Sequence, residues 1–206
     1  MGYNKVHVKV LDPKQGYDLA VNEYKKYWPW LDGFYRIDFN SFLQRASDDI
    51  NIIDLWWWDG RLYQKLSKLK YNKYVACDIS SKILKKYPGR VEKIVCDLDS
   101  NLPFESDFFD LAVSFFVIEH LSDLENFFWE TYRILKIWWK LVLWYFLQNR
   151  EFLWKSNWES FKIKMYKHRI DDIKKIAENC FFDVYLDPVY EKSILSWYIV
   201  VCEKNR

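Results

Sequence analysis

Two acidic side chains stand in or after short apolar runs, where Asp54 could orient the turn that follows and Asp78 could bind a sugar. Asp54 lies in the run Ile52–Leu55, and Asp78 follows the run Tyr74–Cys77. In open α/β sheets, ligands bind beyond the carboxyl ends of the strands, and an acid there accepts hydrogen bonds from ribose hydroxyls. These positions predict a nucleotide-type pocket in which Asp78 holds the ribose.

His120 is the best-placed side chain for proton transfer, because it lies just after the apolar run 111–114 and histidine exchanges protons near neutral pH. Glu119 beside it could orient the imidazole or bind substrate. A purely structural histidine is the alternative reading. The four cysteines include no C-x-x-C pair, so we expect no zinc site and predict no metal.

From Ile52 onward, short apolar runs alternate with amphipathic segments, which indicates βαβ units and a parallel sheet. The predicted strands are 52–55, 73–78, 93–96, 111–114 and 140–146, and the predicted helices between them are 61–69, 81–87 and 124–135. A helix at 170–179 and an antiparallel hairpin of 182–186 with 198–202 follow. A strand-like run at 6–11 and helices at 17–27 and 38–45 come before.

The turn after the first predicted strand is unusual. Trp56, Trp57 and Trp58 lead to Gly60, after which a helix is predicted. Such a turn normally needs glycine, because the backbone adopts positive φ and approaches the ligand closely. A bulky residue at positive φ is an outlier.

Asp54-x-Trp56-x-Trp58-x-Gly60 resembles the acid-x-Gly-x-Gly-x-Gly signature of class I S-adenosylmethionine-dependent methyltransferases, with only the last glycine present. A dinucleotide dehydrogenase fingerprint would place its third glycine at Arg61. Further segments resemble motifs of the methyltransferase type 11 or ubiquinone-biosynthesis-like group, in that group's order. They are 74–80, 95–98, 102–104, 108–113, 117–121 and 133–143.

The resemblance implies one Rossmann-like, doubly wound α/β domain over residues 1–206, with a seven-stranded, mostly parallel sheet and an antiparallel closing strand. Residues 1–47 would form a helical cover, 48–147 the cofactor-binding core, and 148–206 a substrate-side insertion and the closing hairpin. In the core, Asp97 and Leu98 would lie beside the adenine. The implied cofactor-binding residues are Asp54, Trp56, Trp58, Gly60, Asp78, Ile79, Asp97, Leu98 and Ser114.

The implied function is in-line methyl transfer from S-adenosyl-L-methionine to a small-molecule or lipid-like acceptor. Residues 148–167 and the N-terminal cover would choose that acceptor. The alternative is a methyltransferase-fold binding or scaffold protein whose cofactor site the indoles obstruct. A third and weaker reading is an RNA or protein methyltransferase, and a net charge of +2 argues against RNA.

Tryptophan replaces glycine in a coherent pattern. The chain has 5 glycines and 12 tryptophans, which together make about 8% of the residues, close to an ordinary glycine share of about 7%. Trp56, Trp58, Trp138 and Trp139 stand where the family has glycine, and Trp197 is a fifth candidate. We hypothesise that these are glycines in the living protein, as a code that reads UGA as glycine would produce under a tryptophan translation. UGG codons at 56 and 58 would exclude this.

The length and composition of the chain limit the number of domains and the class of protein. With 206 residues, 50% apolar and 29% charged, the chain fits one globular domain. The small net charge gives no strong attraction to nucleic acid or an anionic membrane. The N-terminus lacks an apolar signal core, and no apolar run is long enough to span a membrane. We expect a cytoplasmic protein with reduced cysteines and a small-molecule partner. The oligomeric state stays open.

Overall fold

The structure is a computed structural model that describes residues 8–23, 49–55, 61–66, 70–147, 152–156, 159–191 and 193–205. The predicted helix at 38–45 lies outside the described residues. The turn residues Trp56, Trp58 and Gly60 also lie outside them.

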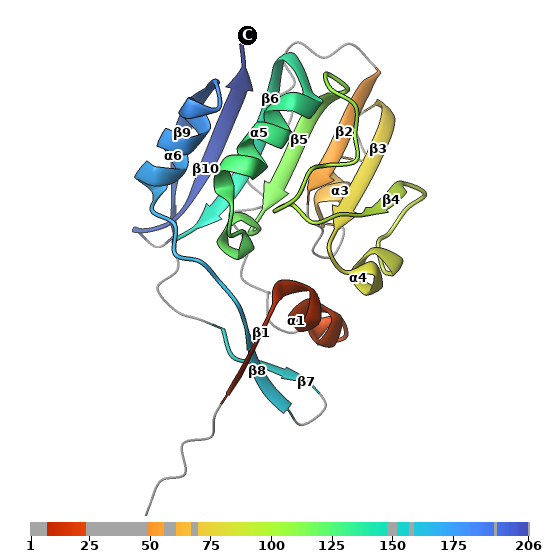
Figure 1. Cartoon of the computed structure of the whole chain (residues 1–206), viewed down its shortest axis with the longest axis vertical. Coiled ribbons are helices and arrows are strands. Elements are labelled where there is room, and N and C mark those ends of the chain that lie inside the picture. The colour runs from red at the N-terminus through yellow and green to blue at the C-terminus, as the bar shows by residue number, and fades with distance from the viewer. Residues whose placement is uncertain are drawn as a thin grey trace, which may run out of the picture.

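The main sheet of the described chain has seven strands in the order β4-β3-β2-β5-β6-β10-β9 (Figure 1). Neighbouring strands from β4 to β6 are parallel, whereas β10 runs antiparallel to both β6 and β9. Their bounds are β2 Ile50–Leu55, β3 Tyr71–Asp78, β4 Glu92–Val95, β5 Phe109–Phe115, β6 Leu135–Phe146, β9 Phe182–Glu191 and β10 Ile194–Lys204. The expected Rossmann-like sheet with an antiparallel closing strand is confirmed.

The direction in which strands are added reverses between β2 and β5. Because parallel crossovers are right-handed, the helices before and after this point cover opposite faces of the sheet. The helices are α3 Arg61–Leu66, α4 Ser81–Lys85, η3 Ile118–His120, α5 Leu124–Ile134 and α6 Ile170–Asn179. Figure 1 shows α5 and α6 together in front of the sheet. The reversal makes the carboxyl ends of β2 and β5 a natural ligand crevice.

Burial on both faces explains why the central strands are almost continuously apolar. All six residues of β2 and all seven of β5 are buried. Asp123 caps the start of α5, since its carboxylate accepts a hydrogen bond from the amide of Asn126 at 2.9 Å. The helix α6 has the predicted bounds.

The strand β6 begins five residues earlier than predicted, but its first part is irregular. Phe109 pairs with Leu135, whereas Leu111 pairs with Lys140, so the chain bulges between these two pairs. Trp138 lies in the bulge at φ 71° and is 53% exposed. This backbone conformation favours glycine strongly over tryptophan, which supports the hypothesis that glycine is the native residue at position 138.

A second, three-stranded sheet joins distant parts of the chain. Its strands are β1 Lys9–Leu11, β8 Glu159–Ile163 and β7 Trp154–Ser156, with β8 in the middle. The helix α1 Pro13–Ala20 packs on it, and a Cβ atom at Gly16 would lie 2.5 Å from Ile163. Figure 1 shows this unit next to the edge at which the parallel strands of the main sheet end. We call β1, α1, β7 and β8 the cap.

The cap corrects two predictions for the N-terminal segment. The helix predicted at 17–27 begins earlier, at Pro13, and ends at Ala20. It starts there because Asp12 accepts a hydrogen bond from the amide of Gln15 at 2.9 Å, and proline suits the first helical turn. The strand-like run at 6–11 becomes the shorter β1 at Lys9–Leu11, which pairs with β8 from a distant part of the chain.

Candidate functional site

A cavity of about 310 Å³ lies between the main sheet and the cap. The main sheet contributes the ends of β3 and β4 and the segments that follow them, and η3 contributes its last residues. The cap contributes the start of α1 and the chain that follows β8. The lining residues are Asp12, Pro13, Lys14, Cys77, Asp78, Ile79, Cys96, Asp97, Leu98, Asp99, His120, Leu121, Lys164 and Tyr166.

Asp78 ends β3 and is only 2% exposed. One carboxylate oxygen accepts a hydrogen bond from the amide of Ser80 at 2.7 Å, which fixes the side chain at the head of α4. An acid held in this way is suited to accept hydrogen bonds from the two hydroxyls of a ribose.

The chain after β4 supplies a second acidic segment to the cavity. Asp97 is exposed, and its carboxylate accepts a hydrogen bond from the amide of Asp99 at 3.0 Å. Asp99 in turn accepts hydrogen bonds from the amides of Ser122 and Asp123, so this segment is fastened to the start of α5. Leu98 is buried between the two acids and adds an apolar surface.

His120 reaches the cavity from η3 and is held on both ring nitrogens. Nδ1 lies 2.9 Å from the carbonyl oxygen of Lys164, so it must carry the hydrogen and donate it. Nε2 lies 2.8 Å from the hydroxyl of Tyr17. Burial lowers the pKa of His120 from 6.5 to about 4, so the ring is neutral at pH 7 and Nε2 accepts the tyrosine hydrogen.

Glu119 points away from the cavity, toward the end of β6. Its Oε1 accepts a hydrogen bond from the amide of Phe146 at 2.9 Å, and its buried Oε2 has no hydrogen-bond partner among the described residues. Burial raises the pKa of this carboxyl group to about 7. The two neighbours predicted to act together in catalysis therefore face different surroundings.

Two other predicted site residues do not line the cavity. Asp54 is fully buried in β2, and its carboxylate accepts hydrogen bonds from the hydroxyls of Tyr74 at 3.1 Å and Tyr87 at 3.2 Å. Burial raises the pKa of Asp54 well above its usual value. Ser114 is buried in β5, and its hydroxyl has no partner among the described residues.

Four predicted residues come together in the cavity, together with His120: Asp78, Ile79, Asp97 and Leu98. The sequence interpretation missed the contributions of the cap. One signal was available, because Asp12-Pro13 is a typical helix start. Lys164 and Tyr166 follow β8, the middle strand of the small sheet, and no local pattern in the sequence marks them as site residues.

The cavity chemistry fits an adenosine group. Carboxylates at the ends of two neighbouring strands can accept hydrogen bonds from ribose hydroxyls and an amino group, and the side chains of Ile79 and Leu98 offer apolar surface to a base. Among the described residues, no group of three histidine, cysteine or acidic side chains could hold a metal ion. Burial raises the pKa of the Cys77 thiol, so it is a poor nucleophile.

The comparisons agree with this geometry. Residues 59–138 match the family model described as a methyltransferase domain, and no curated protein matches the chain. The match indicates a methyltransferase domain at residues 59–138, which is less than half of the chain, and the fold is that of solved S-adenosylmethionine-dependent methyltransferases, whose cofactor is S-adenosyl-L-methionine.

Solved structures with this fold cover most of the chain. An S-adenosylmethionine-dependent methyltransferase of Methanosarcina mazei is 18% identical with a TM-score of 0.63, over 82% of this chain and 99% of its own. The phosphoethanolamine N-methyltransferase 2 of Haemonchus contortus, in complex with S-adenosylhomocysteine, is 16% identical with a TM-score of 0.59, over 81% of this chain and 52% of its own. The [4+2]-cyclase SpnF is 12% identical with a TM-score of 0.68, over 96% and 98%.

Proposed function

We propose that the protein transfers the methyl group of S-adenosyl-L-methionine to a small-molecule or lipid-like acceptor by in-line displacement. The observation that carries the proposal is the cavity in which Asp78, Asp97 and His120 meet at the carboxyl ends of the parallel strands. When bound, the cofactor supplies a methyl group on a sulfonium, which is a good leaving group. The protein's own contribution is then mainly alignment, which can account for a large part of a rate enhancement.

Different residues of the chain would hold different parts of the cofactor. Asp78 would hold the ribose, while Asp97 and Leu98 would lie beside the adenine. Asp54 does not line the cavity and would support the first strand from behind through Tyr74 and Tyr87. Trp56, Trp58 and Gly60 would bind the methionine part of the cofactor, and we propose Ser114 as a further cofactor-binding residue.

A hydroxyl or amine acceptor must also lose a proton, and the candidates are His120 and Glu119. The Nε2 lone pair of His120 accepts the Tyr17 hydroxyl, so His120 can take a proton from an acceptor only after that bond opens. Glu119 has a pKa of about 7, suited to proton exchange near neutral pH, but it faces Phe146 rather than the cavity.

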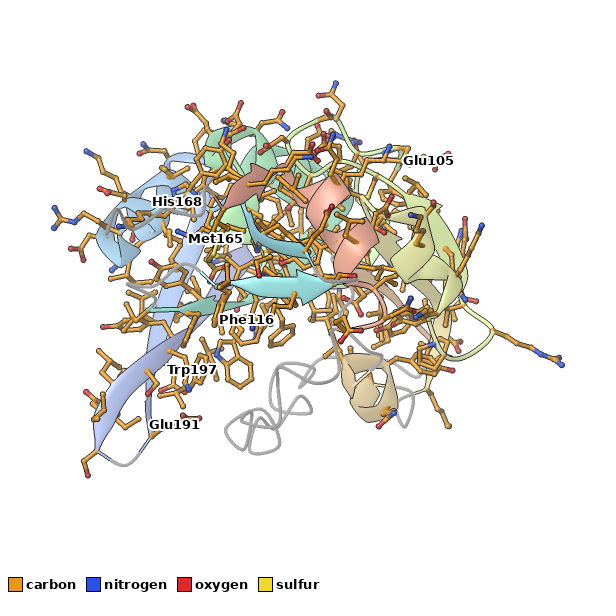
Figure 2. All side chains as sticks on the ribbon, turned by 90° about the horizontal axis from the view of Figure 1, so that it is seen from below. Glu105, Phe116, Met165, His168, Glu191 and Trp197 are labelled. Carbon is orange, nitrogen blue, oxygen red and sulfur yellow. The ribbon has the colours of Figure 1, made fainter. Side chains whose placement is uncertain are left out.

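An aromatic cluster at the ends of β5, β6 and β10 favours an apolar acceptor. Phe116 and Phe146 meet there with ring centroids 6.1 Å apart. In the printed sequence Trp197, a candidate glycine position, adds a third ring that stacks on Phe146 at 4.4 Å between centroids. Figure 2 shows Phe116 and Trp197 beside each other below the small sheet. Phe116 is half-buried at φ 57°, so the chain directs this ring at the strand end despite an unfavourable backbone conformation.

Calorimetric titration with S-adenosylhomocysteine tests the proposal. It should be run on protein of the printed sequence and on the variant Trp56→Gly/Trp58→Gly/Trp138→Gly/Trp139→Gly. Micromolar binding by either form supports the enzyme, and methyl transfer to a panel of small and lipid-like acceptors would follow. Binding by the glycine variant alone shows that the indoles obstruct the site. If UGG codons show that the tryptophans are native, absence of binding by the printed sequence alone favours the alternative, a binding or scaffold protein whose site the indoles obstruct. Absence of binding by both forms contradicts the proposal.

The proposed enzyme also has an expected compartment and partner. We propose a cytoplasmic location, and the free, buried cysteines of the described residues are compatible with a reducing compartment. None of the described helices is both long and apolar enough to cross a membrane. We propose a small-molecule acceptor as the partner, without nucleic acid.

A further inference from the structure

We infer that the segment after β8 binds the adenosine part of the cofactor, with Tyr166 as a stacking surface for the base and Lys164 as its support. This inference rests on the proposed function. It assigns cofactor binding to part of the insertion at 148–167, which the sequence alone associates with acceptor choice. We call residues 164–169 the strap, since they connect β8 to α6.

The strap is fixed along η3 by a series of hydrogen bonds. The carbonyl oxygen of Lys164 accepts from His120 Nδ1, and the amide of Tyr166 donates to the carbonyl oxygen of Glu119 at 2.7 Å. His168 Nε2 donates to the carbonyl oxygen of Leu121 at 3.0 Å. Figure 2 shows Met165 and His168 along this segment, between the small sheet and α6. The strap backbone is therefore held in place before any ligand binds.

The strap is also tied to the N-terminal part of the cap. The amide of Lys164 donates to the carbonyl oxygen of Leu11 at 2.8 Å, at the point where β1 ends and α1 is about to begin. Lys14 lies in the first turn of α1 and lines the same cavity. Tyr17 of α1 donates to His120, which holds the strap from the other side. The cap and the main sheet thus position the strap jointly.

The side chains that this backbone presents to the cavity suit a base. Tyr166 is half-buried, and the ammonium group of Lys164 lies over its ring at 4.8 Å from the centroid. A cation on one face of an aromatic ring leaves the other face for stacking. Aromatic side chains bind bases in this way, with losses on alanine substitution of about 1–3 kcal/mol for each base in nucleic-acid complexes.

The opposite side of the cavity carries the polar groups that would bind the sugar and the edge of the base. Asp78 and Asp97 stand at the ends of β3 and β4, where they can accept hydrogen bonds from the sugar and the base edge, while Tyr166 can contact the base only through its ring and hydroxyl. An adenosine placed between them has polar contacts along its edge and an aromatic ring over its face. Bound cofactor would then connect the main sheet to the cap.

The experiment compares S-adenosylhomocysteine with methylthioadenosine, which keeps the adenosine and lacks the amino acid part. Binding of both ligands is measured by calorimetry for the parent protein, Tyr166→Ala, Tyr166→Phe and Tyr190→Ala. The parent is the printed sequence or its four-glycine variant, whichever binds S-adenosylhomocysteine. Tyr190 is 57% exposed on β9 and serves as the control for loss of a tyrosine ring. Thermal unfolding without ligand confirms that each variant is folded.

Tyr166→Ala should weaken both ligands by the same factor, tenfold or more, whereas Tyr166→Phe and Tyr190→Ala should bind within about twofold of the parent. Unchanged binding by Tyr166→Ala overturns the inference and leaves the proposed function standing. A loss confined to S-adenosylhomocysteine also overturns it, because Tyr166 would then act on the amino acid part. If neither parent form binds either ligand, both the inference and the proposed function fail. Should Tyr166→Ala not fold, a tenfold loss in Tyr166→Leu decides in the same way.

Discussion

The hydroxyl group of Tyr17 lies 2.8 Å from Nε2 of His120, although 103 residues separate them in the chain. Their rings also meet edge to face, with centroids 5.4 Å apart. Because the other nitrogen of His120 donates to Lys164, one neutral imidazole joins α1, η3 and the strap. The histidine predicted as a catalytic base is thus also a junction between the cap and the main sheet.

Removal of the tyrosine hydroxyl should weaken this junction. In Tyr17→Phe, the buried Nε2 lone pair of His120 loses its donor, and we expect a loss of about 1–3 kcal/mol in the free energy of unfolding. Urea unfolding at pH 7 measures it. Tyr190→Phe, on an exposed side chain of β9, should change stability by less than about 0.5 kcal/mol. Equal stabilities for the parent and Tyr17→Phe would show that the bond contributes nothing.

The imidazole of His120 should stay neutral over an unusually wide pH range. Burial lowers its pKa from 6.5 to about 4, so its contribution to stability is complete above about pH 6.5 and is lost as the pH falls through about 4. NMR spectra of the ring should show no titration between pH 8 and about pH 5. A midpoint near 6.5 would mean that the ring is solvated and that the strap is not held as described.

Glu119 should produce a pH dependence of the opposite sign. Burial raises its pKa from 4.5 to about 7, so its contribution to stability is complete below about pH 4.5 and is lost as the pH rises through about 7. The loss is on the order of 3 kcal/mol. Glu119→Gln should remove this slope from urea unfolding curves collected across the range, while Glu105→Gln, on an exposed loop, should keep it. A slope that survives in Glu119→Gln would assign the effect elsewhere.

The same substitution should have opposite effects at two exposed tryptophans. Trp138→Gly relieves a left-handed backbone conformation at φ 71° and should stabilise the protein by about 1 kcal/mol. Trp129→Gly lies inside α5 and should destabilise it by at least about 1 kcal/mol. Thermal unfolding of both variants measures the contrast. Destabilisation by both would argue against glycine as the native residue at 138.

Loss of the carboxylate at the end of β3 should reduce cofactor affinity without unfolding the chain. Asp78→Asn keeps an acceptor for the amide of Ser80 but removes the charge that accepts the ribose hydroxyls. We expect S-adenosylhomocysteine to bind at least tenfold more weakly, since hydrogen bonds to charged groups contribute about 1.5–3 kcal/mol. Asp187→Asn, exposed on β9, controls for net charge and should bind normally. Equal affinities for both variants would remove Asp78 from the site.

The main sheet could be predicted because buried parallel strands produce a recognisable pattern of apolar residues in the sequence. The residues of β2 and β5 face covered surfaces on both sides, so each strand reads as a continuous apolar run between polar segments. The start of β6 could not be predicted. Its pairing shifts between Leu135 and Lys140, and such a bulge depends on the neighbouring strand rather than on local preference.

The candidate site could be predicted only on the side of the main sheet. Asp78 and Asp97 follow strands directly, so their position at the sheet edge could be deduced from the run before them. The strap side depends on pairing between β1 and β8, which are short and far apart in the chain. The sequence from Lys164 to Tyr166 has no periodicity that would predict this contact between distant segments. The opposite directions of the Glu119 and His120 side chains could not be predicted either, because they depend on the short turn of η3.

The fit of Gly16 against Ile163 has a consequence for biosynthesis. As the chain leaves the ribosome, β8 follows β1 and α1 only about 150 residues later, a delay of roughly 10 to 30 s at typical elongation rates. During that interval the apolar side chains of Leu11, Tyr17 and Ala20 lack the strand that covers them. The nascent chain therefore exposes this apolar segment, and chaperones that shield emerging chains should bind it before the cap can form.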